Sequence, residues 1–418
     1  MKIIILGAGL SGLIAGRELS KDHEVTILEK EDHAGGLASS FAQNGWYIPK
    51  FYHHVIASNA YTIRELERCG LMKEAVWKRI RMKIGIAGKF YSFRNPLKLI
   101  YMPGASLWAK FRFSLFGIYS LFFMNPDTIP DHLSAKELLD KYCGKEATDF
   151  FWWNLYGRNK FNLPLKQISA KQFAYRLCEK EVYDKFTFPP SGIEEMLRGI
   201  EKTIREQKGD ICLNTAITEV DVNTKTVLLD SGRTMRFEAL ISSIPMPEFV
   251  KIARGLPADY AAQLARIRYC PAVCMCFATR QFLKKGVYWT NFFGEHIHIL
   301  IQHSVLIDQY GDKISWVMRY GGSEEDLGKS DDEIRAIYLR DLEKYFDNVE
   351  PVWYKIFRSA YAEPIWDKEY AGYAPGFETP IPHLFMTGIQ VMFPQIRNQH
   401  TALESGYEVV QRLRSRFA

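Results

Sequence analysis

The first thirty residues contain two kinds of hydrophobic pattern, one typical of strands and one typical of helices. Residues 3–6 form an unbroken apolar run, which is typical of a buried strand, and residues 13–19 place apolar side chains with helical spacing. A second apolar run over 24–28 follows and ends at Glu29. The order strand, helix, strand predicts a βαβ unit whose two strands lie parallel.

Two further patterns follow along the chain. We expect mostly helix from about residue 71 to 185 and a mixture of strands and helices from about 250 to 375. Strands are expected over 272–279, 297–303 and 314–320. Capping-box spacings, a serine or threonine followed three residues later by glutamate, predict helix starts near Ser134, Ser191, Ser330 and Thr401.

The turn between the first strand and the first helix carries three glycines with dinucleotide-binding spacing. Gly7 suits a tight turn, Gly9 lets backbone approach a diphosphate, and Gly12 permits close packing of helix on strand. The helix start supplies free N–H groups and partial positive charge for an anion. Glu29 can accept hydrogen bonds from ribose hydroxyls and repels a 2′-phosphate. The pattern predicts a dinucleotide site that disfavours NADP.

A second glycine pair, Gly35 and Gly36, follows the acid closely. Glycines there would let a second stretch of backbone close over the diphosphate. This extended signature, residues 29–40, resembles that of the FAD-binding flavoproteins that include amine oxidases, protoporphyrinogen oxidases, phytoene desaturases and UDP-galactopyranose mutases. The resemblance implies FAD as cofactor and an α/β fold, in which a Rossmann-type, glutathione-reductase-like FAD-binding domain carries an inserted α+β substrate domain.

The resemblance continues at the other end of the chain. Residues 383–388 look like the family's late strand and glycine, and residues 401–406 look like the start of the helix that approaches the flavin ring. Many relatives carry an acidic residue directly after that glycine, where this chain has Ile389 and Gln390. Cofactor contacts in this corner therefore differ from the family pattern.

The family's architecture also implies how the chain divides into domains. The FAD-binding domain would be discontinuous and combine residues 1–70, 190–250 and 375–418. Residues 71–189 would form a helical substrate or cap region, and residues 251–374 would form a mixed substrate domain of sheet and helices.

Taken together, the glycine chemistry and the resemblance define an expected set of cofactor-binding residues. These are Gly7, Gly9, Leu10, Ser11, Gly12, Glu29, Lys30, Gly35, Gly36, Leu37, Ala38, Ile217, Gly388, Asn398, Thr401 and Ala402. The backbone at Ile217 would face the adenine, because residues 209–220 resemble a later strand of the cofactor domain.

His53 and His54 are the candidate catalytic residues. They lie where UDP-galactopyranose mutases and related sugar-pathway flavoproteins carry a histidine near the isoalloxazine. An imidazole with an ordinary pKa near neutrality suits proton transfer. A purely structural hydrogen-bonding role is the alternative.

Composition narrows the partners of the protein. The apolar content of 47% and the net charge of +6 are ordinary for a globular protein, so nucleic acid is not an expected partner. Basic residues are concentrated between 73 and 112, where Glu74 is the single acid, and this favours an anionic ligand or an anionic membrane surface; a solvated face balanced by acids elsewhere in the fold is the alternative. Aromatic residues crowd residues 108–123, which we interpret as a helix buried over a substrate cavity; peripheral membrane contact through 73–123 is the alternative.

Cysteine usage and hydropathy predict the compartment. Seven cysteines without a CxxC pair indicate no zinc site, and Cys270, Cys274 and Cys276 share one face of a strand, as core residues do. No signal peptide precedes the first strand, and the longest apolar run, 113–124, is shorter than the ~20 residues of a spanning helix. We expect no metal site and a cytoplasmic protein, with membrane-peripheral attachment left open.

The leading functional hypothesis is an FAD-dependent oxidoreductase. It would transfer a hydride from a C–H or C–N centre of a small substrate to flavin N5. The rival is a redox-neutral, flavin-dependent mutase acting on a nucleotide sugar, which segment 52–54 and the basic stretch favour, whereas the ending at 402–406 favours the oxidoreductase. A flavoprotein without turnover is a third class. An anionic nucleotide sugar, a lipid-linked substrate, an isoprenoid, a tetrapyrrole and an amine all remain open as substrates.

Overall fold

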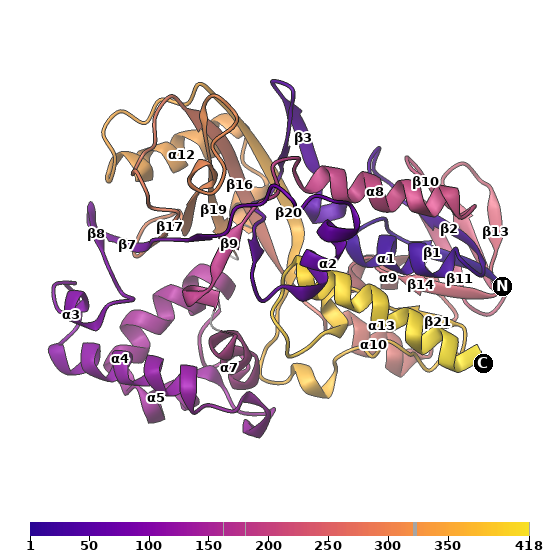
Figure 1. Ribbon diagram of the computed structural model, residues 1–418. Coiled ribbons are helices and arrows are strands. Elements are labelled where there is room, and N and C mark those ends of the chain that lie inside the picture. The colour runs from indigo at the N-terminus through magenta and orange to yellow at the C-terminus, as the bar shows by residue number, and fades with distance from the viewer. Residues whose placement is uncertain (162, 180, 321–323, 418) are drawn as a thin grey trace.

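The computed structural model describes residues 1–161, 163–179, 181–320 and 324–417. Figure 1 shows the two termini at the same end of the molecule, beside the sheet that contains β1 and β2. The helical region with α4, α5 and α7 and the sheet with β16 to β20 lie at the opposite end.

The expected βαβ unit forms the centre of a five-stranded parallel sheet. Its strands, in spatial order, are β10 (Asp210–Cys212), β2 (Glu24–Leu28), β1 (Lys2–Leu6), β14 (Ala239–Ser242) and β21 (Leu384–Met386). Ile3 pairs with Val25 on one side and Ala239 on the other. Strands from the beginning, middle and end of the chain therefore lie side by side.

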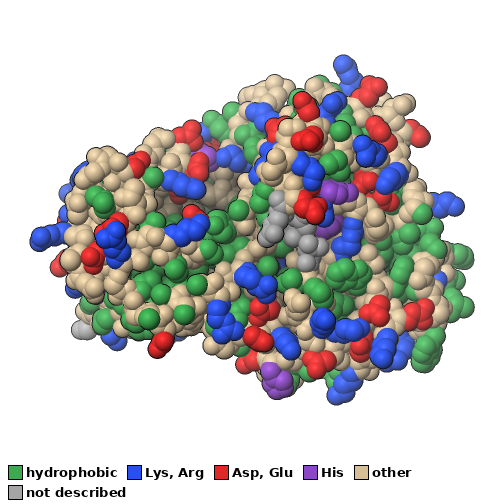
Figure 2. Space-filling view, turned by 180° about the vertical axis from the view of Figure 1, so that it is seen from behind, with side chains coloured by type: hydrophobic (Ala, Val, Ile, Leu, Met, Phe, Trp, Pro, Cys, Tyr) green, Lys and Arg blue, Asp and Glu red, His purple; other side chains and the backbone are tan. Residues whose placement is uncertain are grey.

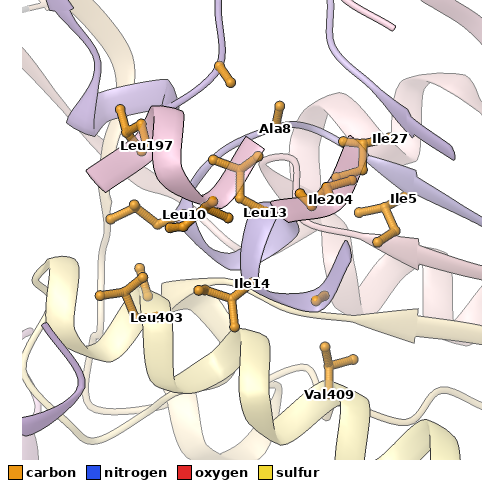
Figure 3. Close-up of a cluster of buried hydrophobic side chains, with 14 of the residues drawn as sticks. Ile5, Ala8, Leu10, Leu13, Ile14, Ile27, Leu197, Ile204, Leu403 and Val409 are labelled. Atoms are coloured by element: carbon orange, nitrogen blue, oxygen red, sulfur yellow. The ribbon is translucent and has the colours of Figure 1, made fainter. Parts of the chain in front are cut away.

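Both faces of the parallel sheet are buried, which explains why its strands are continuously apolar. Ile3 and Ile5 face three helices: α1 (Leu10–Leu19), α8 (Ile193–Glu206) and α13 (Gln399–Phe417). Figure 3 shows side chains from these helices meeting Ile5 and Ile27 in one cluster. The other face packs against α9 (Met246–Ile252), α10 (Ala258–Ala265) and a mixed sheet of β13 (Thr234–Arg236), β12 (Thr226–Leu229), β11 (Ile217–Asp221) and β15 (Ala253–Arg254).

A seven-stranded mixed sheet forms the second core. Its order is β20 (Trp353–Pro364), β16 (Tyr269–Thr279), β19 (Lys313–Tyr320), β18 (Ile299–Gln302), β17 (Trp289–Phe292), β7 (Met82–Ile86) and β8 (Lys89–Tyr91). Helix α12 (Asp331–Glu343) covers one face, after the short α11 (Glu324–Leu327). Cys274 and Cys276 pack on the other face, so the prediction that they are core residues is confirmed.

Two small sheets lie between the large ones. The first is the hairpin of β3 (Ser40–Gln43) and β4 (Trp46–Pro49), and the second has the order β5 (Val55–Ile56), β9 (Lys185–Thr187) and β6 (Lys78–Arg79). Ile48, Ile56 and Phe186 from these sheets join the same cluster as Cys274 and Cys276. The two small sheets therefore connect the nucleotide-binding unit to the seven-stranded sheet. Helix α2 (Ala60–Arg68) follows β5 and packs on α13.

The helical region forms its own aromatic core. Its helices are α3 (Pro96–Leu99), α4 (Leu107–Phe122), α5 (Ala135–Tyr142), α6 (Lys145–Ala147), α7 (Ala170–Cys178) and a π-helix over Thr148–Phe161. Phe113 of α4 stacks on Phe151 of the π-helix with ring centroids 4.3 Å apart. Residues 71–189 hold strands as well as the expected helices, because β7 pairs in parallel with the distant β17.

Two of the four predicted capping boxes are confirmed and two are wrong. Ser134 and Ser330 each accept from the N–H three residues on, and the facing glutamate accepts from the serine N–H. Helix α8 instead begins after Gly192, with no side-chain cap. Helix α13 begins at Gln399, and Thr401 N donates to Asn398 Oδ1 at 3.0 Å. At α13 the side chain of Asn398, three residues before Thr401, thus accepts from a free N–H group at the helix start.

Helix α4 departs from its interpretation as a buried helix. Phe113 and Phe116 are buried, but Trp108, Phe111 and Phe122 are exposed. The hydrophobic periodicity could not show which face of the helix is exposed, because both faces are apolar. Within the described residues, no helix combines the length and apolar character that crossing a membrane requires.

Candidate flavin site

The two glycine-containing segments, residues 7–12 and 35–36, lie against each other and are called here the phosphate cradle. Gly35 N donates to Ala8 O at 2.8 Å, and a Cβ built on Gly36 would lie 3.4 Å from Gly9 Cα. A Cβ on Gly9 would meet no atom within 4 Å. Gly9 thus borders open space at the N-terminus of α1, where N–H groups and the helix dipole can hold an anion.

Two other glycines shape the turn rather than the open space. Gly7 has a φ of +92°, which favours glycine, and a Cβ on Gly12 would lie 2.1 Å from Gly7 O. These residues allow the chain to reverse directly into α1. Leu10 and Ser11 then open that helix and are buried.

Glu29 lies at the mouth of the cradle. Its carboxylate accepts hydrogen bonds from Ala8 N at 2.8 Å and Glu31 N at 3.1 Å. Its backbone oxygen accepts from Thr215 N, which ties this end of β2 to the segment leading into β11. Ile217 opens β11 and is half-buried. An acid therefore borders both the diphosphate position and the strand expected to face an adenine.

Other predicted residues near the cradle differ in exposure. Lys30 is mostly exposed and lies 3.8 Å from a Glu31 carboxylate oxygen. Leu37 and Ala38 form a short 3₁₀ turn with Gly36, in which Ala38 is buried. Ala38 belongs to the core between the sheet and the helices, so its side chain supports the cradle rather than lining it.

The C-terminal helix meets the cradle helix at their N-terminal ends. Ser11 Oγ donates to Ala402 O at 2.8 Å, and Ser405 Oγ lies 3.0 Å from Ser11 Oγ. Gly388 N donates to Ser405 Oγ at 3.1 Å. Residues predicted from opposite ends of the chain are therefore joined through Ser405, whose role the sequence reasoning missed. A small hydroxyl in a helix gives little local signal of such a contact.

The start of α13 has an unused buried acceptor. Gln399 Nε2 donates to His54 O at 2.9 Å, whereas Gln399 Oε1 is buried without a hydrogen-bond partner. Such an atom costs free energy unless a ligand satisfies it. Asn398 is engaged as the helix cap, and Thr401 Oγ1 donates to Ile396 O at 2.6 Å. The open cradle and the unused acceptor both fit a dinucleotide that extends toward α13.

Burial lowers the pKa of both candidate histidines. His53 Nδ1 lies 2.9 Å from Phe51 O, and His54 Nδ1 lies 3.1 Å from the Tyr288 hydroxyl. The hydrogen bond to Phe51 O opposes this effect at His53, whereas at His54 nearby positive charge, including that of Lys160, adds to burial and lowers the pKa to about 3. The prediction of an ordinary imidazole pKa is therefore wrong for His54. Its ring is neutral and stacks on Tyr52, with centroids 5.7 Å apart.

A charged group that sequence reasoning missed lies beside these histidines. It is called here the Lys160 cluster and consists of Lys160, Arg176, Glu181, Glu363 and Arg397. Arg176 lies 3.3 Å from Glu181, and Arg397 lies 2.9 Å from Glu363. Arg176, Glu181 and Glu363 keep side-chain exposures of 20%, 14% and 17%. The cluster therefore borders solvent-accessible space rather than a sealed core.

Lys160 is the uncompensated charge of this cluster. It is 8% exposed, and within the described parts of the chain no carboxylate oxygen lies within 4.0 Å of Nζ. Its Nζ lies 4.9 Å above the Trp289 ring, 5.1 Å above the Tyr320 ring and 3.4 Å from the Tyr52 hydroxyl. Burial, followed by the charge of Arg176, lowers the pKa of Lys160 to about 7. Aromatic faces compensate a cation only in part.

Arg319, Arg358 and Arg397 could each bind an anion by residue type, but all three are in ion pairs. Arg319 lies 3.1 Å from Asp326, and Arg358 lies 2.7 Å from Asp331. Of the three, Arg397 belongs to the Lys160 cluster. The described residues contain no group of histidine, cysteine, aspartate or glutamate side chains that could hold a metal ion.

Sequence comparison assigns the family. The model of the flavin containing amine oxidoreductases matches residues 10–414, so the chain belongs to this family. The resemblance inferred from the glycine segments is confirmed, as is the class of flavin-dependent oxidoreductases to which the family belongs. The cofactor that the family name specifies is a flavin.

Two curated relatives match part of the chain. An uncharacterised protein of Methanocaldococcus jannaschii is 24% identical over 261 residues, 60% of each chain. The flavin-containing amine oxidase B of Canis lupus familiaris is 24% identical over 274 residues, 60% of this chain and 51% of that protein. The matches thus span about 60% and one half of the relatives' own lengths.

Solved structures share the fold over nearly the whole chain. A reduced UDP-galactopyranose mutase superposes with a TM-score of 0.79 at 14% identity, covering 99% of this chain and 95% of that one. A putrescine oxidase bound to putrescine gives 0.76 at 17% identity, covering 99% of each. An oxidoreductase of Methanosarcina mazei gives 0.75 at 16% identity, covering 98% and 100%. The predicted α/β fold class is confirmed.

Proposed function

We propose that the chain binds FAD from the phosphate cradle to the start of α13 and transfers a hydride from a C–H or C–N centre of a small acid to flavin N5. The observation that carries the proposal is the open space beside Gly9, together with the unused acceptor of Gln399. FAD, when bound, supplies the hydride acceptor.

The chain's own residues bind and orient the cofactor in this proposal. N–H groups at the start of α1 hold the diphosphate, Glu29 accepts from the ribose hydroxyls, and the backbone at Ile217 faces the adenine. Gly388, Asn398, Thr401 and Ala402 border the ring end. The N-terminus of α13 would favour negative charge there.

The Lys160 cluster selects an acidic substrate in this proposal. A cationic amine entering beside Trp289 and Tyr320 would meet aromatic faces that Lys160 already occupies, and like charges would repel it. A carboxylate or phosphate would instead supply the missing countercharge. The acidic group of a nucleotide sugar or of a lipid-linked substrate would also supply this countercharge. Tyr52 and Tyr320, whose hydroxyls lie 3.3 Å apart, narrow the space around that group.

The acid-binding role of Lys160 predicts a pH dependence. Its lowered pKa means that the ammonium is present below about pH 7 and is lost above it. Benzoate, titrated into FAD-loaded protein and followed by flavin absorbance, should bind more weakly as the pH rises, by up to about ten-fold per pH unit above that pKa. Lys160→Met should remove this dependence. Lys171→Met is the matched control, because Lys171 is already paired with Asp131 at 2.8 Å. A dependence that survives in Lys160→Met would exclude the proposed role.

Anaerobic mixing tests the reaction type. Under argon, oxidised protein mixed with a panel of acidic C–H and C–N substrates should lose its flavin absorbance with at least one of them, with one substrate oxidised per flavin reduced. A mutase would leave oxidised flavin unchanged. It would convert a nucleotide sugar only after reduction by dithionite, with no net transfer of electrons, and that outcome would replace the oxidoreductase by the rival.

A further inference from the structure

Helix α4 is apolar on two opposite faces. One face packs into the helical region through Ala109, Phe113 and Phe116. The opposite face is exposed. Its side chains are one, three or four residues apart, a spacing that places them all on one side of the helix. They are Leu107, Trp108, Phe111, Leu115, Ile118 and Phe122. A helix that is apolar all round is normally covered on all sides.

The exposed side chains continue beyond the helix. Leu97, Ile100 and Tyr101 of the neighbouring α3 segment are exposed too, and helices α3 and α4 are in contact. Ten of the seventeen exposed large hydrophobic side chains of the described chain lie between residues 97 and 123. In Figure 2, hydrophobic side chains gather at the surface of the helical region, on the right. A concentrated patch of this kind marks an interaction surface.

The segment of sequence that carries this face is basic. Residues 75–126 contain no aspartate or glutamate and nine basic residues, of which Lys110 is buried and donates from Nζ to Ile100 O at 2.9 Å. Lys98 is exposed between Leu97 and Ile100. Burial, and then the charges of Lys98, Lys284 and Arg81, lowers the pKa of Lys83, so these four cations lie near one another. Glu146 of α6 is an acid beside the start of α4, where it accepts hydrogen bonds from Ser106 N and Oγ at 2.6 Å each.

We propose that the exposed face of α3 and α4 docks on an anionic lipid bilayer, with α4 lying in the plane of the interface. Apolar and aromatic side chains would enter the boundary of the acyl chains while the surrounding lysines and arginines meet lipid phosphates. The helix has 16 residues, too few to span a bilayer. This proposal is independent of the flavin chemistry.

Charge also argues against a second copy as the occupant of this face. In a symmetric dimer the same patch meets itself, so Lys98 and its neighbouring cations would oppose their own copies. Repulsion between like charges would weaken that contact. Lipid phosphates carry the opposite sign and have no such cost.

Vesicle flotation with the full chain tests the proposal. Wild-type protein should float with vesicles of phosphatidylcholine containing one third phosphatidylglycerol and should be released as salt rises. Pure phosphatidylcholine should hold less of it. Trp108→Glu/Leu115→Glu, at positions 65% and 53% exposed, should lower the partition coefficient by about ten-fold or more without changing the melting temperature. Val352→Glu, at an exposed apolar position elsewhere, is the matched control and should float as wild type does.

Three results would overturn the proposal. The first is wild-type protein that floats with neither vesicle. The second is equal loss of flotation in Val352→Glu and in the double variant. The third is a dimer in sedimentation velocity that Trp108→Glu/Leu115→Glu converts to monomer, because a second copy would then cover the face. Lys98→Glu separates the electrostatic part: it should weaken binding to anionic vesicles and leave binding to neutral ones unchanged.

Discussion

The Gly9→Val variant is expected to fold as wild type does and to purify without flavin. Gly9 has φ −70° and ψ 173°, an extended conformation that valine adopts readily. A Cβ there meets no protein atom within 4 Å, so the substitution leaves the packing intact. The valine methyls would occupy the open space of the phosphate cradle. We expect FAD affinity to fall by about a hundred-fold or more, because a displaced diphosphate loses several N–H contacts.

Fluorescence titration of flavin-free protein with FAD measures this effect. Gly372→Val is the matched control, since Gly372 is exposed, has no positive φ and also has no atom within 4 Å of a built Cβ. It should bind FAD as wild type does. Retention of tight binding by Gly9→Val would place the diphosphate elsewhere, whereas equal loss in both variants would point to a general effect of added valine.

Replacing Arg17 by methionine should cause the largest loss of stability among single substitutions away from the cradle. Arg17 of α1 pairs with Glu65 of α2, which is fully buried, and its Nη2 donates to the Tyr407 hydroxyl of α13 at 2.6 Å. Methionine keeps the apolar stem but leaves a buried carboxylate with less countercharge. The free energy of unfolding should fall by about 3–5 kcal/mol, measured by denaturant titration.

A double variant distinguishes loss of charge from loss of packing. Arg17→Met/Glu65→Leu removes both charges and should regain at least half of the lost stability, because no buried charge remains unpaired. Lys202→Met breaks an exposed pair with Glu206, 3.7 Å apart, and should change stability by less than about 1 kcal/mol. If Arg17→Met lowered the free energy of unfolding as little as Lys202→Met does, the buried pair would contribute nothing to the packing of α1, α2 and α13.

Local features of the nucleotide-binding unit could be predicted from the sequence. The apolar runs of β1 and β2, the glycine turn and the following helix are encoded within thirty consecutive residues, and the structure has them where expected. Ser134 and Ser330 cap their helices because the serine and glutamate that make each box are three residues apart. Such features depend mainly on neighbours in the chain, so pattern can predict them, although the same spacing at Ser191 and Thr401 makes no capping box.

Long-range features could not be predicted in the same way. Lys160 meets Tyr52, Trp289 and Tyr320 only because four separate segments converge. The lowered pKa of His54 likewise follows from burial, which a sequence does not display. The cap of α13 was misplaced by three residues, since Asn398 and Thr401 are both good caps and the loop geometry decides between them.

The flavin content of the purified full-length chain tests the central claim most directly. Protein denatured after purification should release one FAD per chain, identified and quantified by chromatography. If the protein purifies without flavin, added FAD should bind to the same stoichiometry. A folded, colourless protein that takes up no FAD would contradict the account, because the cradle of Gly9 and Gly36 would then hold no dinucleotide.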